Sequence, residues 1–351
     1  MDDSVGTPAT SLNVFLAHSP FQYFVACHMI VSIPEYRSAR NCLVVDRVWG
    51  GQEPDQGPWS DLVDLMPPVG GSVLGAGRRM RGALGRIIAL VRTADLVRLF
   101  VTNVQWPLNN VVLTAVTAES SRRSVEVCNY PEGLGSLRLV YPTSGQRWRD
   151  MMKGTLGLFG GVAYRPIKYD LMGLEGCDLI YSFWPHLLPD RLRGKAVAIP
   201  AFPALPATVE LHTCIFLGQN DRLVSTALRQ PAAAAASAYC RKLPYDRFLY
   251  KPHHYGQSET QRSAFLEAGF EEITDSCSVE QMLLSHPVAC VVSFNSSALV
   301  HLKMMYGERI RCIACLPDLF GSLARNRADR SDDVRRLFEQ SGVEIVDDIM
   351  S

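Results

Sequence analysis

Two series of short apolar runs, separated by a proline-rich stretch, constrain the fold of this chain more than any other feature. In the first half, runs rich in Val, Leu, Ile and Phe occupy residues 12–17, 41–46, 97–102, 123–128 and 177–182. Each run is nearly continuous rather than alternating, which is typical of strands buried on both faces of a parallel sheet. The first half therefore predicts five such strands.

Helical segments are expected between these strands, near residues 80–93, 107–119 and 146–157. Another helix is expected after the first strand, where Ser19 and Gln22 have the spacing of a capping box and Pro20 suits the first helical turn. Strands that alternate with helices in this way predict a parallel sheet covered on both faces.

The same rhythm restarts after the proline-rich stretch 196–211, whose composition suits a linker better than a continuing element. Helices are expected at 221–243, with a break at Pro231, at 258–269 and at 295–307. Strands are expected at 213–220, 246–254, 288–294 and 309–315. The chain thus predicts an α/β protein with two Rossmann-like domains, residues 1–205 and 206–351, facing each other across a cleft.

The charge balance excludes one class of partner. The 351 residues include 35 Lys and Arg and 35 Asp and Glu, so the formal net charge is zero and a basic face for nucleic acid is not expected. The arginine-rich stretch 77–86 can be a solvated loop and helix start, or a contact with an anionic acceptor or a membrane surface.

The cysteines and the termini predict the compartment. Most of the ten cysteines lie inside apolar runs, which indicates buried thiols in a reducing compartment. The one C-x-x-C, Cys312 with Cys315, has no second pair and is a poor zinc candidate. The N-terminus lacks the features of a signal peptide, and no run is long enough to span a membrane. We expect a cytoplasmic protein, compatible with peripheral contact with the inner membrane.

Polar residues gather just after five of the predicted strands, at the edge where open α/β sheets bind ligands. These segments are "HSPFQ" (18–22), "YPEG" (130–133), "LGQN" (217–220), "KPHHYG" (251–256) and "FNSSAL" (294–299). Their shared position makes them the candidate site segments.

Two of these segments suit an anion. Ser296 and Ser297 fall at a predicted helix N-terminus, where free N–H groups and the helix dipole favour negative charge. The alternative is N-capping by Asn295 or Ser296. Lys251 and His253 share one exit loop with a second histidine, and imidazole can donate to a phosphate oxygen.

A third segment offers an acid. Glu132 lies between Pro131 and Gly133 at the tip of a predicted strand, where it could be a general base or an ordinary turn carboxylate. No carboxylate cluster with metal-ligand spacing accompanies it, so we expect neither a metal nor another cofactor.

Taken in order, these motifs resemble the bacterial sialyltransferase and polysialyltransferase group, glycosyltransferase families 38 and 52. That group has an acidic-acidic-Gly motif, a Lys-x-His-Pro motif and a paired Ser/Ser-Thr motif, similar to "PEG", "KPHH" and "NSSA" here. The openings "AHSPFQYFVA" and "IFLGQN" also resemble it. The resemblance implies a glycosyltransferase B-type (GT-B) fold.

The resemblance also implies a reaction. An inverting, metal-independent enzyme would move sialic acid or a related ulosonic acid from a CMP-activated donor to a sugar hydroxyl of a surface glycan, such as a capsule or lipooligosaccharide. Residues 1–205 would hold the acceptor and residues 206–351 the donor. The implied catalytic residues are Glu132 as base and His253 on the phosphate. The implied donor-binding residues are Lys251, Ser296, Ser297, Gly218, Gln219 and Asn295, and the acceptor-side residues are Ser19, Gln22 and Gly133.

Two departures from the group's pattern leave alternatives open. Pro131 stands in place of the first acid, and a second histidine stands in place of the proline after His253. The literal His286-Pro287 precedes a predicted strand, on the wrong edge of the sheet. A two-domain nucleotide-sugar epimerase and a non-catalytic nucleotide-binding relative are the alternatives, and the oligomeric state is left open.

Overall fold

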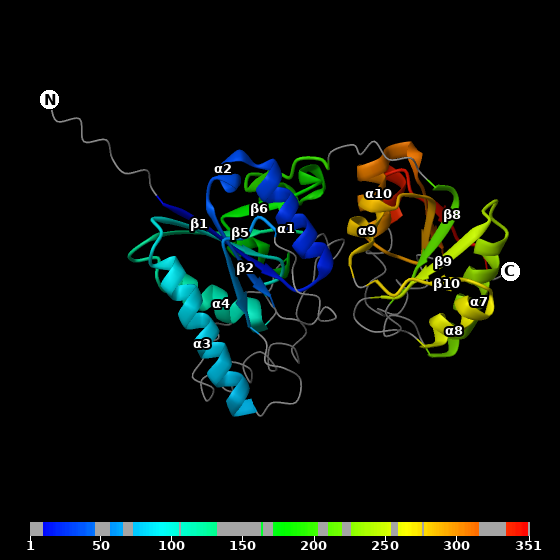
Figure 1. Ribbon diagram of the computed structural model, residues 1–351. Helices are drawn as coiled ribbons and strands as arrows, with labels where there is room; N and C mark the ends of the chain where they lie inside the picture. The colour runs from blue at the N-terminus through cyan, green and yellow to red at the C-terminus, as the bar shows by residue number, and fades with distance from the viewer. Residues whose placement is uncertain are drawn as a thin grey trace. The chain divides into compact units, whose positions relative to one another are not determined.

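The computed structural model divides into two compact units, Met1–Pro200 and Ala201–Ser351, and each is described by itself (Figure 1). Each unit contains one sheet, and all neighbouring strands within it are parallel. The structure describes residues 10–45, 57–65, 73–104, 107–131, 163, 171–202, 210–219, 226–253, 259–275, 277–315 and 335–349.

The sheet of the first unit has the strand order β3-β2-β1-β4-β5-β6-β7. This is the doubly wound order, in which the chain first builds outward from β1 in one direction and then in the other. The strands are β1 (Ser11–Ala17), β2 (Arg40–Val45), β3 (Asp61–Asp64), β4 (Leu96–Val101), β5 (Ser124–Asn129), β6 (Leu179–Ser182) and β7 (Ala196–Ala198). The order reverses between β1 and β4, which defines the switch point of this sheet.

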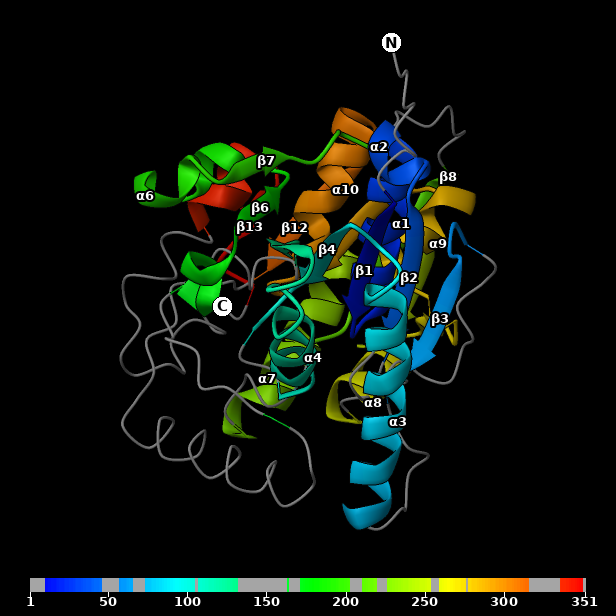
Figure 2. The same ribbon diagram turned by 90° about the vertical axis from the view of Figure 1, so that its left-hand side faces the viewer.

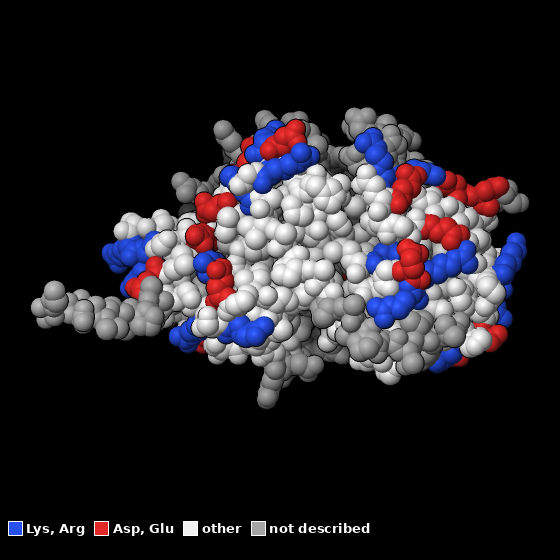
Figure 3. Space-filling model, turned by 90° about the horizontal axis from the view of Figure 1, so that it is seen from above, with Lys and Arg blue, Asp and Glu red and all other residues white. Residues whose placement is uncertain are grey.

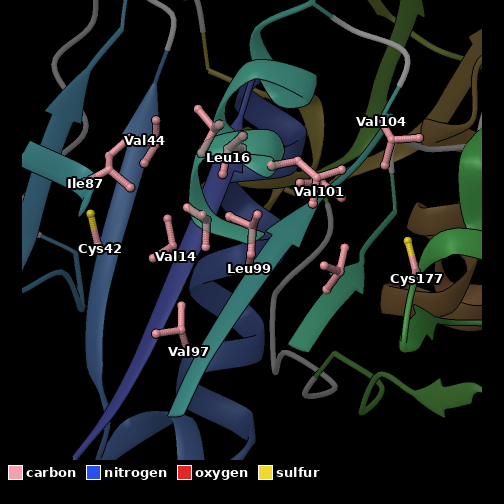
Figure 4. Close-up of a cluster of buried hydrophobic side chains, with 14 of the residues drawn as sticks. Val14, Leu16, Cys42, Val44, Ile87, Val97, Leu99, Val101, Val104 and Cys177 are labelled. Atoms are coloured by element: carbon pink, nitrogen blue, oxygen red, sulfur yellow. The ribbon is translucent and has the colours of Figure 1, made fainter. Parts of the chain in front are cut away.

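Helices cover both faces of the first sheet, as Figure 2 shows. On one face, α3 (Val73–Val91) and α4 (Pro107–Thr117) pack on alternate strand residues such as Val14 and Leu16, with Ile87 of α3 among them (Figure 4). Burial of these aliphatic side chains is the main stabilising term for this layer. The short helix α6 (Asp190–Arg193) and the 3₁₀ turns Leu171–Gly176 and Pro185–Leu187 accompany β6 and β7.

The other face of the first sheet carries an aromatic layer beneath α1 (Pro20–Ser32) and α2 (Pro34–Arg37). The rings of Phe15 and Phe100 stack with centroids 4.0 Å apart, and Tyr36 of α2 meets Phe100 edge-on. Because strand side chains alternate between faces, Phe15 points to this layer while its neighbours Val14 and Leu16 enter the aliphatic one.

The second unit repeats the same topology with the order β10-β9-β8-β11-β12-β13. Its strands are β8 (Glu210–Leu217), β9 (Arg247–Lys251), β10 (Glu271–Glu272), β11 (Val288–Ser293), β12 (Arg311–Cys315) and β13 (Glu344–Val346). Here the order reverses between β8 and β11, so the second switch point lies between the ends of these two strands.

Helices cover the second sheet, and four of them have described bounds. The helices α7 (Thr226–Arg241) and α8 (Glu259–Glu267) bury their apolar residues on one face, against Phe216 and Val292 among others. The helices α9 (Val279–Ser285) and α10 (Ala298–Tyr306) pack against each other, and α10 also packs against β11 and β12. A 3₁₀ turn, Gly307–Arg309, follows α10.

The expected helix break at Pro231 is wrong, because α7 runs through this residue. Pro231 is exposed, whereas Ala232, Ala233 and Ala236 form the buried stripe of the helix. A proline removes one intrahelical hydrogen bond. On the exposed side, the carbonyl that loses its donor can be solvated, and the buried alanine stripe holds the helix together.

Every strand expected from the sequence is present, within a few residues of its expected bounds. The strands that were not expected are the edge strands: β3 and β7 in the first sheet, and β10 and β13 in the second. Consequently the stretch 196–211 is not wholly a linker, since β7 and the start of β8 lie within it. The expected helix at 146–157 lies outside the described residues.

The thiols and the surface agree with the expectations from composition. All ten cysteines are free; eight are buried, and Cys27 and Cys277 are half-buried. Lys and Arg side chains lie interspersed with Asp and Glu on the face seen in Figure 3. In the described part of the chain, no helix is long and apolar enough to cross a membrane.

Candidate functional site

The five candidate segments all follow the carboxyl ends of strands, as expected from the sequence. They leave β1, β5, β8, β9 and β11, and two of these strands, β8 and β11, flank the switch point of the second sheet. In the first unit β1 flanks the switch point, with β4 as its partner. Parallel strands end on one edge, so each unit gathers its candidate side chains at one edge of its own sheet.

A buried histidine occupies the switch point of the first unit. His18 directly follows β1, and its Nε2 atom pairs with Oδ1 of Asn109 in α4. Asn109 in turn donates through Nδ2 to the carbonyl of Asn103, at 2.8 Å, in the segment that leaves β4. The pair therefore joins the exits of the two strands that flank the switch point.

A second polar group at this switch point is Thr102, which follows β4 and is only 1% exposed. Its Oγ1 atom is buried and has no hydrogen-bond partner among the described residues. A buried hydroxyl without a partner carries a desolvation cost. A polar group of a ligand could satisfy it.

The two acceptor-side residues Ser19 and Gln22 shape the start of α1. Ser19 is the N-cap, and its Oγ atom accepts a hydrogen bond from the backbone N–H of Gln22 at 3.3 Å. The side-chain oxygen of Gln22 accepts from the backbone N–H of His18 at 2.5 Å. Both side chains are buried, and these oxygens hold the loop that carries His18.

The exit of β5 is anchored up to Tyr130, two residues before the predicted base. Asn129 donates through Nδ2 to the carbonyls of Val101 and Thr102, at 3.1 and 2.8 Å. Tyr130 is fully buried and donates to the carbonyl of Leu16 at 2.6 Å. Glu132 and Gly133 lie outside the described residues.

In the second unit, Gly218 and Gln219 leave β8 in a tightly packed turn. A Cβ atom on Gly218 would lie 2.7 Å from the Tyr250 hydroxyl, so a larger residue does not fit there. Gln219 exchanges two hydrogen bonds with the side chain of Gln261, at 2.9 and 3.0 Å, and donates through Nε2 to Ser293 at 3.1 Å. This network ties β8, β11 and α8 together at the switch point.

Lys251 ends β9 with its side chain turned into the protein. It is 7% exposed, and its Nζ atom donates to the backbone carbonyl of Asp275 at 2.7 Å. Burial lowers the pKa of this amine, while the neighbouring charges of Cys277, Asp275 and Glu280 act in the opposite direction. The ammonium is thus held by a protein carbonyl.

His253 follows two residues after β9 and is half-buried. Burial lowers its pKa below the ordinary value of 6.5, so the imidazole is neutral at neutral pH. A neutral imidazole still offers one N–H donor, and a nearby phosphate would favour its protonated form.

The segment that leaves β11 contains three polar side chains in a row. Asn295 has a buried Oδ1 atom without a partner among the described residues. Ser296 Oγ accepts from the N–H of Ala298 at 3.3 Å, as expected of a local cap. Ser297 is the N-cap of α10, but its hydroxyl makes no capping hydrogen bond. The Ser297 hydroxyl is therefore not used as a cap acceptor at the helix N-terminus.

The described residues contain no group of three or more His, Cys, Asp or Glu side chains placed to hold a metal ion. His286 precedes β11 at the opposite edge from the candidate segments and is exposed. It therefore lies at the edge of the sheet that the sequence predicted, away from the candidate segments.

Sequence reasoning missed several residues that build these edges. Asn103 follows a predicted strand, as the candidate segments do, but its segment was not singled out, and Asn109 lies inside a predicted helix. Gln261, Glu280 and His301 lie inside helices at positions with no motif around them. Only the tertiary packing brings them to the strand ends.

No protein-family model and no curated protein matches the chain. Solved structures of low sequence identity resemble it over nearly its whole length. An α/β-galactoside α-2,3-sialyltransferase from Photobacterium phosphoreum has a TM-score of 0.54 and 11% identity, covering 96% of this chain and 98% of that chain. The GT-B domain of a sialyltransferase from Photobacterium damselae has a TM-score of 0.51 and 13% identity, covering 96% and 100%.

A third structure of similar likeness is that of a putative UDP-N-acetylglucosamine 2-epimerase from Listeria monocytogenes. Its TM-score is 0.52 at 9% identity, and the match covers 88% of this chain and 79% of that chain. These likenesses and the two parallel sheets confirm the fold class: α/β, with two Rossmann-like domains of the GT-B type.

Proposed function

We propose that this protein is an inverting glycosyltransferase that moves a sialic acid, or a related ulosonic acid, from a CMP-activated donor to a sugar hydroxyl of a surface glycan. The observation that carries the proposal is the set of polar groups at the second switch point. Asn295, Ser296 and Ser297 leave β11 there beside Gln219, and His253 leaves the strand next to β8. Their order along the sequence supports a sialyltransferase-like enzyme.

In this proposal the second unit binds the donor. The Ser297 hydroxyl and the N-terminus of α10 bind the phosphate of CMP or the carboxylate of the sugar. His253 donates to the departing phosphate, and the cytidine lies near Gly218 and Gln219. The charge that develops on CMP is thereby balanced by fixed donors, which is how such sites lower a barrier.

The first unit supplies the base and binds the acceptor. Glu132 removes the proton from an acceptor hydroxyl as that oxygen attacks the anomeric carbon. The bond from this carbon to the CMP oxygen breaks at the same time, CMP leaves with the electron pair, and the configuration inverts. The segment from Asn129 to Pro131 supplies a rigid support for the base.

The test is release of CMP from CMP-sialic acid, with a sugar acceptor and with chelator present. Glu132→Gln is expected to lower kcat by about 10²- to 10⁴-fold, the range for a general base. The matched control is Glu126→Gln on β5, whose carboxylate pairs with Arg98 at 3.0 Å. Equal activity of Glu132→Gln and wild type would reject the assigned base, and absence of CMP binding would reject the donor.

A nucleotide-sugar epimerase is the second candidate, favoured by the likeness to the Listeria monocytogenes protein. A thermal-shift comparison separates the two candidates. Stabilisation by CMP but not by UDP or UDP-sugars supports the transferase, and the reverse supports the epimerase. Tight CMP binding without turnover on any acceptor would instead indicate a non-catalytic relative.

The setting proposed for the reaction follows from the sequence. We propose a cytoplasmic enzyme with a nucleotide-sugar donor and a glycan acceptor, and with peripheral contact with the inner membrane. Its chemistry as proposed uses no metal and no other cofactor, because the leaving group is stabilised by protein donors.

A further inference from the structure

The second unit buries a lysine, a glutamate and a histidine on three different elements. Lys251 of β9 is 7% exposed, Glu280 of α9 is 3% exposed and His301 of α10 is fully buried. The proposed chemistry uses neither Glu280 nor His301. Buried ionisable groups are costly unless they are paired, so their presence calls for a role.

Lys251 connects the exit of β9 to the turn before α9. Its Nζ atom donates to the carbonyl of Asp275 at 2.7 Å, and the carboxylate of Asp275 accepts from the N–H of Cys277 at 2.9 Å. The next residue, Ser278, is the N-cap of α9 and accepts from the N–H of Gln281 at 3.1 Å. The ammonium therefore holds the start of α9 near the strand end that carries His253.

Glu280 connects α9 to α10. Its Oε1 atom lies 2.9 Å from Nδ1 of His301, and the two helices pack against each other. The backbone N–H of His301 donates to the carbonyl of Ser297 at 3.2 Å, one turn earlier. Any shift of Glu280 would therefore reach the N-terminus of α10.

We propose that Lys251, Glu280 and His301 are positioning residues that fix the loop of His253 and the N-terminus of α10 relative to each other. This gives Lys251 a role different from direct contact with the donor phosphate. We call these three side chains and their contacts the brace. The proposal rests on the proposed function only for the identity of the ligand, since the brace is a property of the free protein.

The first experiment measures amide hydrogen exchange of the full-length protein without ligand. In Lys251→Met, exchange is expected to rise about tenfold or more at residues 275–280 and 296–302, because the brace is cut. The control is Lys303→Met on α10, whose largely covered side chain pairs with the exposed Glu308 at 3.3 Å. An increase confined to residues 251–253 overturns the proposal.

The second experiment tests coupling through the brace. Lys251→Met removes a positive charge that interacts with Glu280, and Glu280→Gln keeps the size and an oxygen for His301 while removing the negative charge. Each single variant is expected to weaken CMP binding by about tenfold, and the double variant is expected to bind no more weakly than either single variant. If the double variant loses CMP affinity by the product of the two single losses, the proposed coupling is rejected.

The two experiments separate the brace from the proposed function. If wild-type protein binds no CMP, the proposed function fails, while the exchange pattern still decides whether the brace exists. If Lys251→Met weakens CMP binding but exchange at 296–302 is unchanged, Lys251 contacts the ligand directly and the positioning role is rejected.

Discussion

The hydroxyl of Tyr130 donates to the backbone carbonyl of Leu16 at 2.6 Å, and so joins the end of β5 to the end of β1 across β4. Tyr130 is fully buried, and its ring meets Phe15 edge-on with centroids 5.9 Å apart. It stands two residues before Glu132 in the sequence. The last anchored side chain before the proposed base is therefore tied to the switch point of its own sheet.

Replacing Tyr130 by Phe removes this hydrogen bond but keeps the ring. We expect the free energy of unfolding to fall by about 1–2 kcal/mol, because a buried carbonyl loses a donor. If the anchor positions Glu132, kcat falls while KM for the donor is unchanged. Urea unfolding and steady-state kinetics measure the two effects.

The control for Tyr130→Phe is Tyr36→Phe, which removes a hydroxyl bonded to Tyr181 in the same aromatic layer. A similar loss of stability is expected there, with kcat retained. Equal losses of kcat in the two variants would show that the effect comes from weakened packing of the layer.

Gly218→Ala tests the tight turn after β8. The added Cβ atom would lie 2.7 Å from the hydroxyl of Tyr250 and 3.3 Å from the carbonyl of Lys251. Overpacking of this kind costs about 1–3 kcal/mol, and Tyr250→Phe in the same chain should return part of it. Gly194→Ala is the control, because nothing lies within 4 Å of its Cβ position and its φ is −65°. Urea midpoints that are equal for both alanine variants would contradict the expected clash.

Alanine substitutions at Ser296 and Ser297 should separate an effect on stability from an effect on CMP binding. Ser296→Ala removes an acceptor of the Ala298 N–H and is expected to cost about 0.5–2 kcal/mol of stability, as for a cap. Ser297→Ala removes no capping bond and should cost less than about 0.5 kcal/mol. Calorimetric titration should show CMP binding weakened about tenfold by Ser297→Ala, as expected when a hydrogen bond to a charged group is lost. An unchanged Kd would remove Ser297 from the donor site.

The pH dependence of stability should carry a signature of His253. Burial lowers its folded-state pKa below 6.5, so the unfolded chain takes up a proton first as the pH falls. The contribution of His253 to the free energy of unfolding is therefore fully present above pH 6.5. It declines below this pH until the pKa of the folded state is reached. The slope is at most about 1.4 kcal/mol per pH unit for one proton.

Urea unfolding between pH 7.5 and 5 measures this slope in wild type and in His253→Gln. The slope should become shallower in the variant but not disappear, because burial also lowers the pKa of His28. The exposed His286 supplies the control substitution, His286→Gln. A slope unchanged by His253→Gln would contradict the buried state of this imidazole.

The sequence predicts the central strands of both sheets because they are buried on both faces and have an unmistakable apolar composition. The edge strands are not predicted, because they are not buried on both faces and lack such an apolar run. The strand β10 has two residues, Glu271 and Glu272, and β7 has three within a proline-rich stretch. Pairing with a neighbouring strand, rather than local composition, makes these segments extended.

The candidate site follows the same rule. Residues that directly leave a strand, such as His253 and Ser297, could be placed at the edge from local pattern alone. Residues that reach the edge through packing could not, because Glu280 and His301 meet across 21 positions of sequence from two helices. The hydrogen bond from Lys251 to Asp275 could not be predicted either, since the accepting carbonyl belongs to the backbone of a distant turn.

The burial of the thiols gives the native sequence a built-in pair of labelling positions. Cys27 of α1 and Cys277 before α9 are the two half-buried cysteines, and the other eight are buried. Burial raises the pKa of both thiols to about 11, so both stay largely protonated at mildly alkaline pH and react slowly with thiol-specific labels. Because one position lies in each unit, the labelling rate of each thiol in the unmutated protein would report the local opening of its own unit.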